Sequence, residues 1–180
     1  DIVYRDFSAW YHIVVSCDLT EGSAGDVLKV YVNNVLQTTG VQESNATVPN
    51  DSTFFNTSGV AMEVGALNAG SFFDGYMAEW HWVDGQALGP ENFGETGTYG
   101  DWKPIEYTGS HGSTGFHLDF KDSSSVSSLG NDVSGNGNHF TVNNIATGEQ
   151  YPDSPTNNFA VMNNLDSGLF ATTFAGGNIK

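Results

Sequence analysis

Residues 72–88 read FFDGYMAEWHWVDGQAL, and this stretch carries the strongest fold signal of the chain. A turn containing glycine leads into residues of strand-type composition, and an Asp-Gly pair ends the strand. Around Trp80 and Trp82 apolar and polar residues alternate, the polar ones being Glu79 and His81. Because side chains alternate across a β-strand, we expect the two indoles on a buried face of a sandwich and the two polar residues on the opposite face.

The composition favours a single domain made of short strands and many turns. The chain has 180 residues, of which 38% are hydrophobic, 13% aromatic and only 14% charged, and it contains 22 glycines. The apolar share is sufficient for a packed core, whereas the glycine content disfavours long helices. No apolar run approaches the roughly 18 residues that a membrane-spanning helix needs, so we expect no membrane partner.

The charge of the chain excludes one class of partner. Five Lys and Arg stand against 21 Asp and Glu, which gives a formal net charge of −16. Such a surface repels phosphate backbones, so nucleic acid is not an expected partner. The carboxylates are suited to collecting calcium or to keeping the chain soluble in salt. A single cysteine, Cys17, excludes an internal disulfide.

Several further strands and turns are predicted from periodicity. The run 10–17 is almost continuously apolar, which is typical of a strand covered on both faces. The alternation in 27–32, followed by Asn33-Asn34, predicts a hairpin. We also expect a helical turn in 89–95, a strand in 115–120 with Phe116, Leu118 and Phe120 inward, and a last strand in 139–143.

Four segments together resemble a known fold family. The segments 10–14 with 28–34, 73–81 and 132–138 resemble the laminin-G-like branch of the concanavalin A-like lectin/glucanase fold. With 153–159 trailing, the combination is similar to virion structural proteins of marine bacteriophages. The resemblance implies an all-β antiparallel jelly-roll sandwich.

The same resemblance sets the expected organisation of the chain. The family normally has several strands before its Trp-Tyr-His strand, and only nine residues precede it here, so we expect an N-terminally incomplete sandwich. We assign residues 1–146 to the sandwich. Residues 147–180 are expected to be a linker and the start of a following module or docking segment.

Catalysis and zinc binding are not expected. Glycosidases use two carboxylates, but Glu79 has no carboxylate two residues before or after it. Zinc sites favour paired ligands at helical spacing or with cysteine partners, and the five histidines show neither pattern. These histidines are His12, His81, His111, His117 and His139.

Calcium and glycan binding have candidate residues, each with an alternative interpretation. Oxygen ligands for calcium come from Asp119, Asp122, Asp132, Asn136 and Asn138, among glycines that allow a tight wrap. The favoured alternative is a turn that satisfies its own backbone. Aromatic rings for sugar stacking come from a glycine-rich loop with Tyr99, Trp102 and Tyr107. Those rings are equally suited to covering the sandwich or packing on a neighbouring subunit.

The sequence therefore favours a non-catalytic, extracellular module on a virion surface or in a tail fibre. Its expected partners are other virion subunits, in a homo-oligomer or fibre, and a host polysaccharide. One alternative is a glycoside hydrolase of the same fold. The other is a secreted lectin, for which Asn45, Asn50 and Asn56 in Asn-x-Ser/Thr triplets would be glycosylation acceptors.

Overall fold

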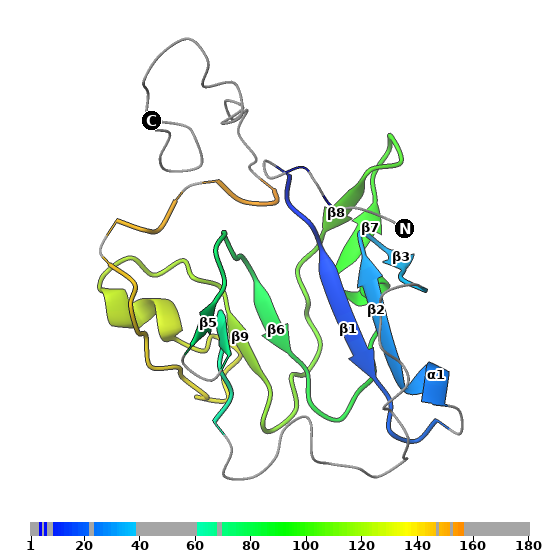
Figure 1. The fold of residues 1–180 in the computed structure, drawn as a ribbon, viewed down its shortest axis with the longest axis horizontal. Coiled ribbons are helices and arrows are strands. Elements are labelled where there is room, and N and C mark those ends of the chain that lie inside the picture. Colours follow the sequence, from blue (N-terminus) through cyan, green and yellow to red (C-terminus); the bar gives the residue numbers. More distant parts are fainter. Residues whose placement is uncertain are drawn as a thin grey trace.

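The structure is a computed structural model whose regular elements are mostly short strands joined by irregular segments (Figure 1). It describes residues 4, 6, 9–21, 24–38, 61–67, 70–146, 148–151 and 153–156. The strands are β1 (Ile13–Cys17), β2 (Leu28–Val32), β3 (Val35–Leu36), β4 (Ala66–Leu67), β5 (Ser71–Phe72), β6 (Trp80–Trp82), β7 (Gly94–Thr96), β8 (Trp102–Pro104) and β9 (Phe116–Leu118). The helical elements are the single turns α1 (Ala24–Val27), η2 (Pro90–Asn92) and η3 (Val126–Gly130).

All strand pairs between these elements are antiparallel, which confirms the predicted β-rich, antiparallel class. The sheets are small: β1-β2-β3, β4-β5, β6-β9 and β7-β8. η2 confirms the helical turn predicted in 89–95. Within the described residues, no helix is long and apolar enough to cross a membrane.

The three-stranded sheet contains the predicted hairpin. Val32 on β2 lies opposite Val35 on β3. Between them Asn33 and Asn34 have φ of +48° and +67°, the left-handed values that a two-residue turn of the primed type requires. Asparagine tolerates this region better than most residues, which explains why the pair serves in place of Asn-Gly. The predicted hairpin is confirmed.

The prediction that the strand at 10–17 is covered on both faces is wrong. Ile13 and Val15 on β1 are 62% and 54% exposed, whereas Val14 between them is 9% exposed. β1 is also at the edge of the order β1-β2-β3. A continuous apolar run is compatible with two covered faces, but here the face that carries Ile13 and Val15 is largely open.

The core lies on one face of the β6–β9 pair. Leu118 and Phe116 on β9 are 2% and 3% exposed, as predicted for these two residues. Their cross-strand partners are Trp80 and Trp82 on β6. Phe120 is half-buried with φ of +53°, so the strand alternation ends before it.

The two indoles are less buried than predicted. Trp80 is 39% exposed and Trp82 is half-buried, so the prediction that both indole rings are buried is wrong for Trp80. The physical reason is the size of the sheet. Among the described strands β6 has one neighbour, β9, and it begins directly after Glu79, whose φ of +51° interrupts the extended backbone.

The core is covered by an irregular segment rather than by the strand predicted in 139–143, which the structure does not form. Phe140 packs against Phe116 with ring centroids 4.7 Å apart. Its backbone N–H donates to the carbonyl of Gly130 at 2.8 Å. Because that hydrogen bond goes to the end of η3, the segment packs without entering a strand ladder.

Gly115 is the closest approach of two chain segments beside β9, and we predict that it does not tolerate a side chain. A Cβ at this position would collide with the carbonyl oxygens of His111 and Trp82, which are backbone atoms. We expect Gly115→Ala to lower the free energy of unfolding by about 3 kcal/mol or more, because the backbone has to shift. Urea denaturation measures the loss.

A matched control separates this clash from general effects of replacing glycine. Gly135 has φ of +93° and nothing within 4 Å of a Cβ. Gly135→Ala is expected to cost about 1 to 2 kcal/mol from backbone strain alone. Equal losses in the two variants would contradict the clash at Gly115.

Candidate functional site

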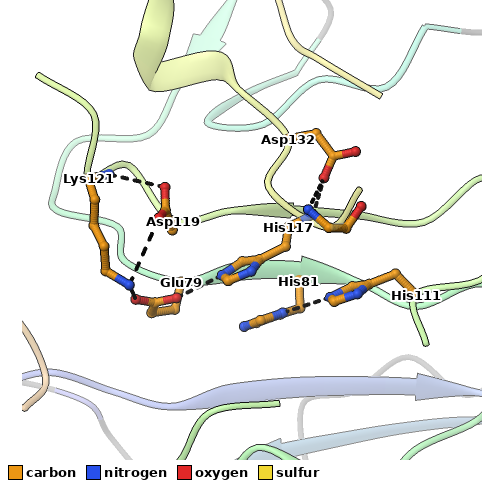
Figure 2. A network of polar contacts seen from close by, with 8 residues as sticks. Glu79, His81, His111, His117, Asp119, Lys121 and Asp132 are labelled. Atoms are coloured by element: carbon orange, nitrogen blue, oxygen red, sulfur yellow. Dashed lines mark hydrogen bonds and ion pairs between the residues drawn. The ribbon is translucent and has the colours of Figure 1, made fainter. Parts of the chain in front are cut away.

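Two histidines face each other across the β6–β9 pair. His81 on β6 lies directly opposite His117 on β9, so both side chains leave the sheet on the same face. Their rings are stacked, with centroids 3.9 Å apart and an interplanar angle of 20°. The strand register alone therefore brings together two residues that are far apart in the sequence (Figure 2).

A third histidine is delivered by the loop that precedes β9. The carbonyl of His111 accepts a hydrogen bond from the backbone N–H of Asp84 at 2.9 Å, which fixes the loop beside the end of β6. The ring of His111 is 14° from the plane of His81, and its Nε2 lies 3.1 Å from Nδ1 of His81. His111 is 8% exposed. We call His81, His111 and His117 the histidine cluster.

Aromatic rings form one wall of the cluster. Phe93 lies 5.6 Å from His81 between ring centroids. The ring edge of Tyr107 meets His111 at 5.1 Å with an interplanar angle of 89°. Phe93 and Tyr107 also contact each other at 4.8 Å, and the Tyr107 hydroxyl donates to the carbonyl of Ser110. The cluster is thus held by a packed aromatic surface.

The other side of the cluster is ionic. Glu79 places Oε2 2.7 Å from Nε2 of His117 and Oε1 2.8 Å from Nζ of Lys121 (Figure 2). The hydrogen bond with His117 lowers the pKa of Glu79 to about 2, against the opposing effect of burial and with the help of Lys121. The hydrogen bond to Glu79 in turn raises the pKa of Lys121. Glu79 is therefore a carboxylate with two partners, His117 and Lys121.

Two rings of the cluster are neutral at neutral pH. Burial, followed by the neighbouring His117 and His111, lowers the pKa of His81 to about 4. Burial and His117 also lower the pKa of His111. A neutral imidazole keeps one ring nitrogen with a free lone pair, which is the state that binds metals.

The ring nitrogens of the three histidines also converge on one region. Each offers a ring nitrogen, and the three nitrogens all lie within 4.8 Å of one another. The spacing of the five histidines along the chain disfavours zinc and does not reveal this convergence in space. One sequence feature points toward the cluster: His81 and His117 each lie in the middle of a predicted strand. Only the pairing of those two strands makes the residues neighbours.

Asp132 anchors the backbone of β9 next to the cluster. Oδ1 of its carboxylate accepts from the backbone N–H groups of His117 and Ser134, and Oδ2 accepts from that of Asn138, each at 2.9 Å. Asp132 is 6% exposed. Burial works against ionisation, but the hydrogen bonds outweigh it and lower the pKa of Asp132 to about 2.

Two asparagine side chains of the same turn hold the loop that carries His111. Nδ2 of Asn136 donates to the carbonyls of Gly112 and Gly115, at 2.6 and 2.8 Å. Nδ2 of Asn138 also donates to the Gly115 carbonyl, at 2.8 Å. These amides therefore tie the 132–138 turn to the loop that carries His111.

The remaining calcium candidates make local contacts. Asp119 accepts from the backbone N–H of Lys121 at 3.2 Å and lies 4.0 Å from its ammonium group. Asp122 accepts from the N–H of Ser124 at 2.9 Å, and hydrogen bonds with Ser124 lower its pKa. The contacts of Asp119 and Asp122 fit the alternative of a turn that satisfies its own backbone, whereas Asp132, Asn136 and Asn138 also bond β9 and the loop before it. Calcium binding stays a prediction.

The three glycan candidates occupy different environments. Tyr99, between β7 and β8, is 94% exposed. Trp102 is half-buried on β8 and donates from Nε1 to Nδ1 of His12 at 2.9 Å. Tyr107 belongs to the wall of the histidine cluster. Asn45, Asn50 and Asn56, together with 157–180, lie outside the described residues.

Comparison with protein-family models, curated proteins and solved structures finds no match to this chain. The fold and the cluster by themselves define a β-rich protein with small antiparallel sheets and a half-buried set of three histidines.

Asp132 gives a prediction about stability. At pH 7, Asp132→Asn is expected to lower the free energy of unfolding by about 2 kcal/mol, since an amide accepts through one oxygen only. Because the folded-state pKa lies below the ordinary 3.8, the carboxylate stabilises the fold above about pH 4, and this contribution is lost as the pH falls toward 2.

Urea denaturation at pH 7 and at about pH 2.5 tests this prediction. The gap between wild type and Asp132→Asn should shrink at the lower pH. Asp122→Asn is the control, because Asp122 is exposed and bonds within its own turn. A gap that is the same at both pH values, or as large for Asp122→Asn, would contradict the role given to Asp132.

Proposed function

We propose that this chain is a non-catalytic, extracellular surface module that packs on neighbouring subunits of a virion surface or fibre and contacts host glycans through Tyr99. The observation that carries the proposal is the 94% exposure of the Tyr99 side chain between the paired strands β7 and β8. Binding residues concentrate on loops held by a rigid scaffold, and this ring is presented in that way.

Tyrosine is suited to this task because its flat ring stacks on the apolar face of a sugar while its hydroxyl stays in water. One ring gives a weak contact. Repeated display on a particle adds such contacts through avidity, so the proposal needs neither a deep pocket nor a tight single site. Trp102 on β8 ties the same hairpin to His12 through a hydrogen bond.

The proposed architecture is a jelly-roll sandwich of laminin-G-like type over residues 1–146, with 147–180 as the linker and the start of a docking segment or following module. The antiparallel pairing of β1 with β2 and of β6 with β9 supports it. So does the burial of Phe116 and Leu118 on the covered face of the β6–β9 pair.

The state of the carboxylates supports a non-catalytic role over glycoside hydrolysis. An acid catalyst needs a raised pKa, whereas the pKa of Glu79 is lowered to about 2 by its partners. A second set of acids, Asp18, Glu21 and Asp26, lines a pocket of about 150 Å³. There, hydrogen bonds from Thr20 lower the pKa of Asp18.

A glycan array tests the proposal with the chain displayed in many copies on a bead or particle. We expect wild type to bind bacterial surface polysaccharides and Tyr99→Ala to lose at least about tenfold of the signal, because the stacking ring is removed. Tyr76→Ala is the matched control, since Tyr76 is another exposed tyrosine (49%).

If the wild type binds no glycan on the array, the glycan contact is ruled out and only packing on neighbouring subunits remains of the proposed function. Unchanged binding by Tyr99→Ala would move the glycan contact to another surface.

A further inference from the structure

We propose that His81, His111 and His117 bind one first-row divalent cation, zinc foremost, and that the ion cross-links β6, β9 and the loop between β8 and β9. This inference goes beyond the surface-module function and does not depend on it. It rests on the position and chemistry of the three rings.

The distances are close to those of a metal site. Zinc bonds histidine nitrogen at about 2.0 to 2.1 Å, so two ligands of a tetrahedral ion lie about 3.3 Å apart. The nitrogens of His81 and His111 are 3.1 Å apart, and those of all three histidines fall within 4.8 Å. The rings are stacked, whereas ligands of one ion aim their nitrogens at a common centre. Binding therefore entails rotation of the rings about their side-chain bonds, with the β6–β9 ladder kept.

The donor set selects the class of cation. Three imidazoles suit zinc, copper, nickel or cobalt, whereas calcium and magnesium require oxygen ligands. Phe93 and Tyr107 shield the ring of His81, and an apolar shell of this kind limits the access of water to the ligands. Three protein ligands leave a fourth position to water.

Glu79 acts as a positioning residue for this site. Ligating histidines commonly donate their other ring N–H to a carboxylate, which fixes the tautomer and orients the ring. The contact between Oε2 of Glu79 and Nε2 of His117, 2.7 Å long, has this form. Lys121 pairs with the other oxygen of the same carboxylate, with Nζ 2.8 Å from Oε1 of Glu79.

The ion would join segments that only non-covalent contacts connect. β6 supplies His81, β9 supplies His117, and His111 comes from the loop held by Asn136. An ion that binds the folded chain and not the unfolded one stabilises it in proportion to the logarithm of its concentration over the dissociation constant.

The test uses the full chain without a histidine tag, first stripped with EDTA. We expect calorimetric titration to give one zinc per chain with a dissociation constant of about 1 µM or tighter, and zinc to raise the thermal midpoint. Cobalt should give the intense visible absorption of a four-coordinate ion. Calcium at the same concentration should not compete with zinc for the three histidines, since calcium requires oxygen ligands.

Variants locate the ion. His111→Gln and His117→Gln should each weaken zinc binding at least tenfold, and Glu79→Gln should weaken it about 10- to 100-fold while keeping the cobalt spectrum. His139→Gln is the matched control and should bind as wild type, because His139 is exposed and lies outside the cluster.

A measurement on wild type covers the case of variants that do not fold. Ring nitrogen resonances of the three cluster histidines should shift with zinc, and that of His139 should not. The proposal is overturned if no zinc binds at about 100 µM. It is equally overturned if the variants keep one zinc with unchanged affinity, or if other histidines shift in place of the cluster.

Discussion

The buried carboxylate of Asp132 is the constraint on which the central part of this structure depends. Its two oxygens gather three backbone N–H groups from β9 and from the turn that follows η3. A buried charge is stable only when its hydrogen-bonding capacity is used, and here the backbone uses it. The turn is thereby fixed on β9, and its asparagine amides extend the connection to the carbonyls of Gly112 and Gly115.

The β6–β9 pair separates two kinds of chemistry on its two faces. One face carries Phe116 and Leu118, which supply the core, and the other carries His81 and His117. Larger sheets commonly place polar side chains of this sort in water. Here Phe93 and Tyr107 cover the ring of His81 as well, and burial lowers the pKa of His81 to about 4, so this ring is neutral near pH 7. The charged residues Glu79 and Lys121 close the open end of that face.

The sequence was sufficient to predict the β-rich class, the Asn33-Asn34 hairpin and the inward orientation of Phe116 and Leu118. Each of these depends on local periodicity or turn chemistry. It was insufficient for the burial of Trp80, Ile13 and Val15, since burial depends on how many strands lie beside a given strand. The histidine cluster required the register of β6 against β9, and no local pattern specifies register between strands separated by more than 30 residues. The five calcium candidates could be recognised in the sequence as oxygen-bearing residues near turns. The backbone N–H groups that donate to Asp132 could not be predicted from it.

The open face of β1 has a consequence for the behaviour of the chain at high ionic strength. Branched apolar side chains at a sheet edge favour pairing of one molecule with the next, and among the described strands β1, which carries Ile13 and Val15, is such an edge. The net charge of −16 opposes this pairing, because two copies of the chain repel each other. The Debye length shrinks from about 10 Å at 0.1 M salt to about 3 Å at 1 M. As brine replaces dilute buffer, the charge repulsion between copies weakens while the apolar attraction remains, and self-association is favoured.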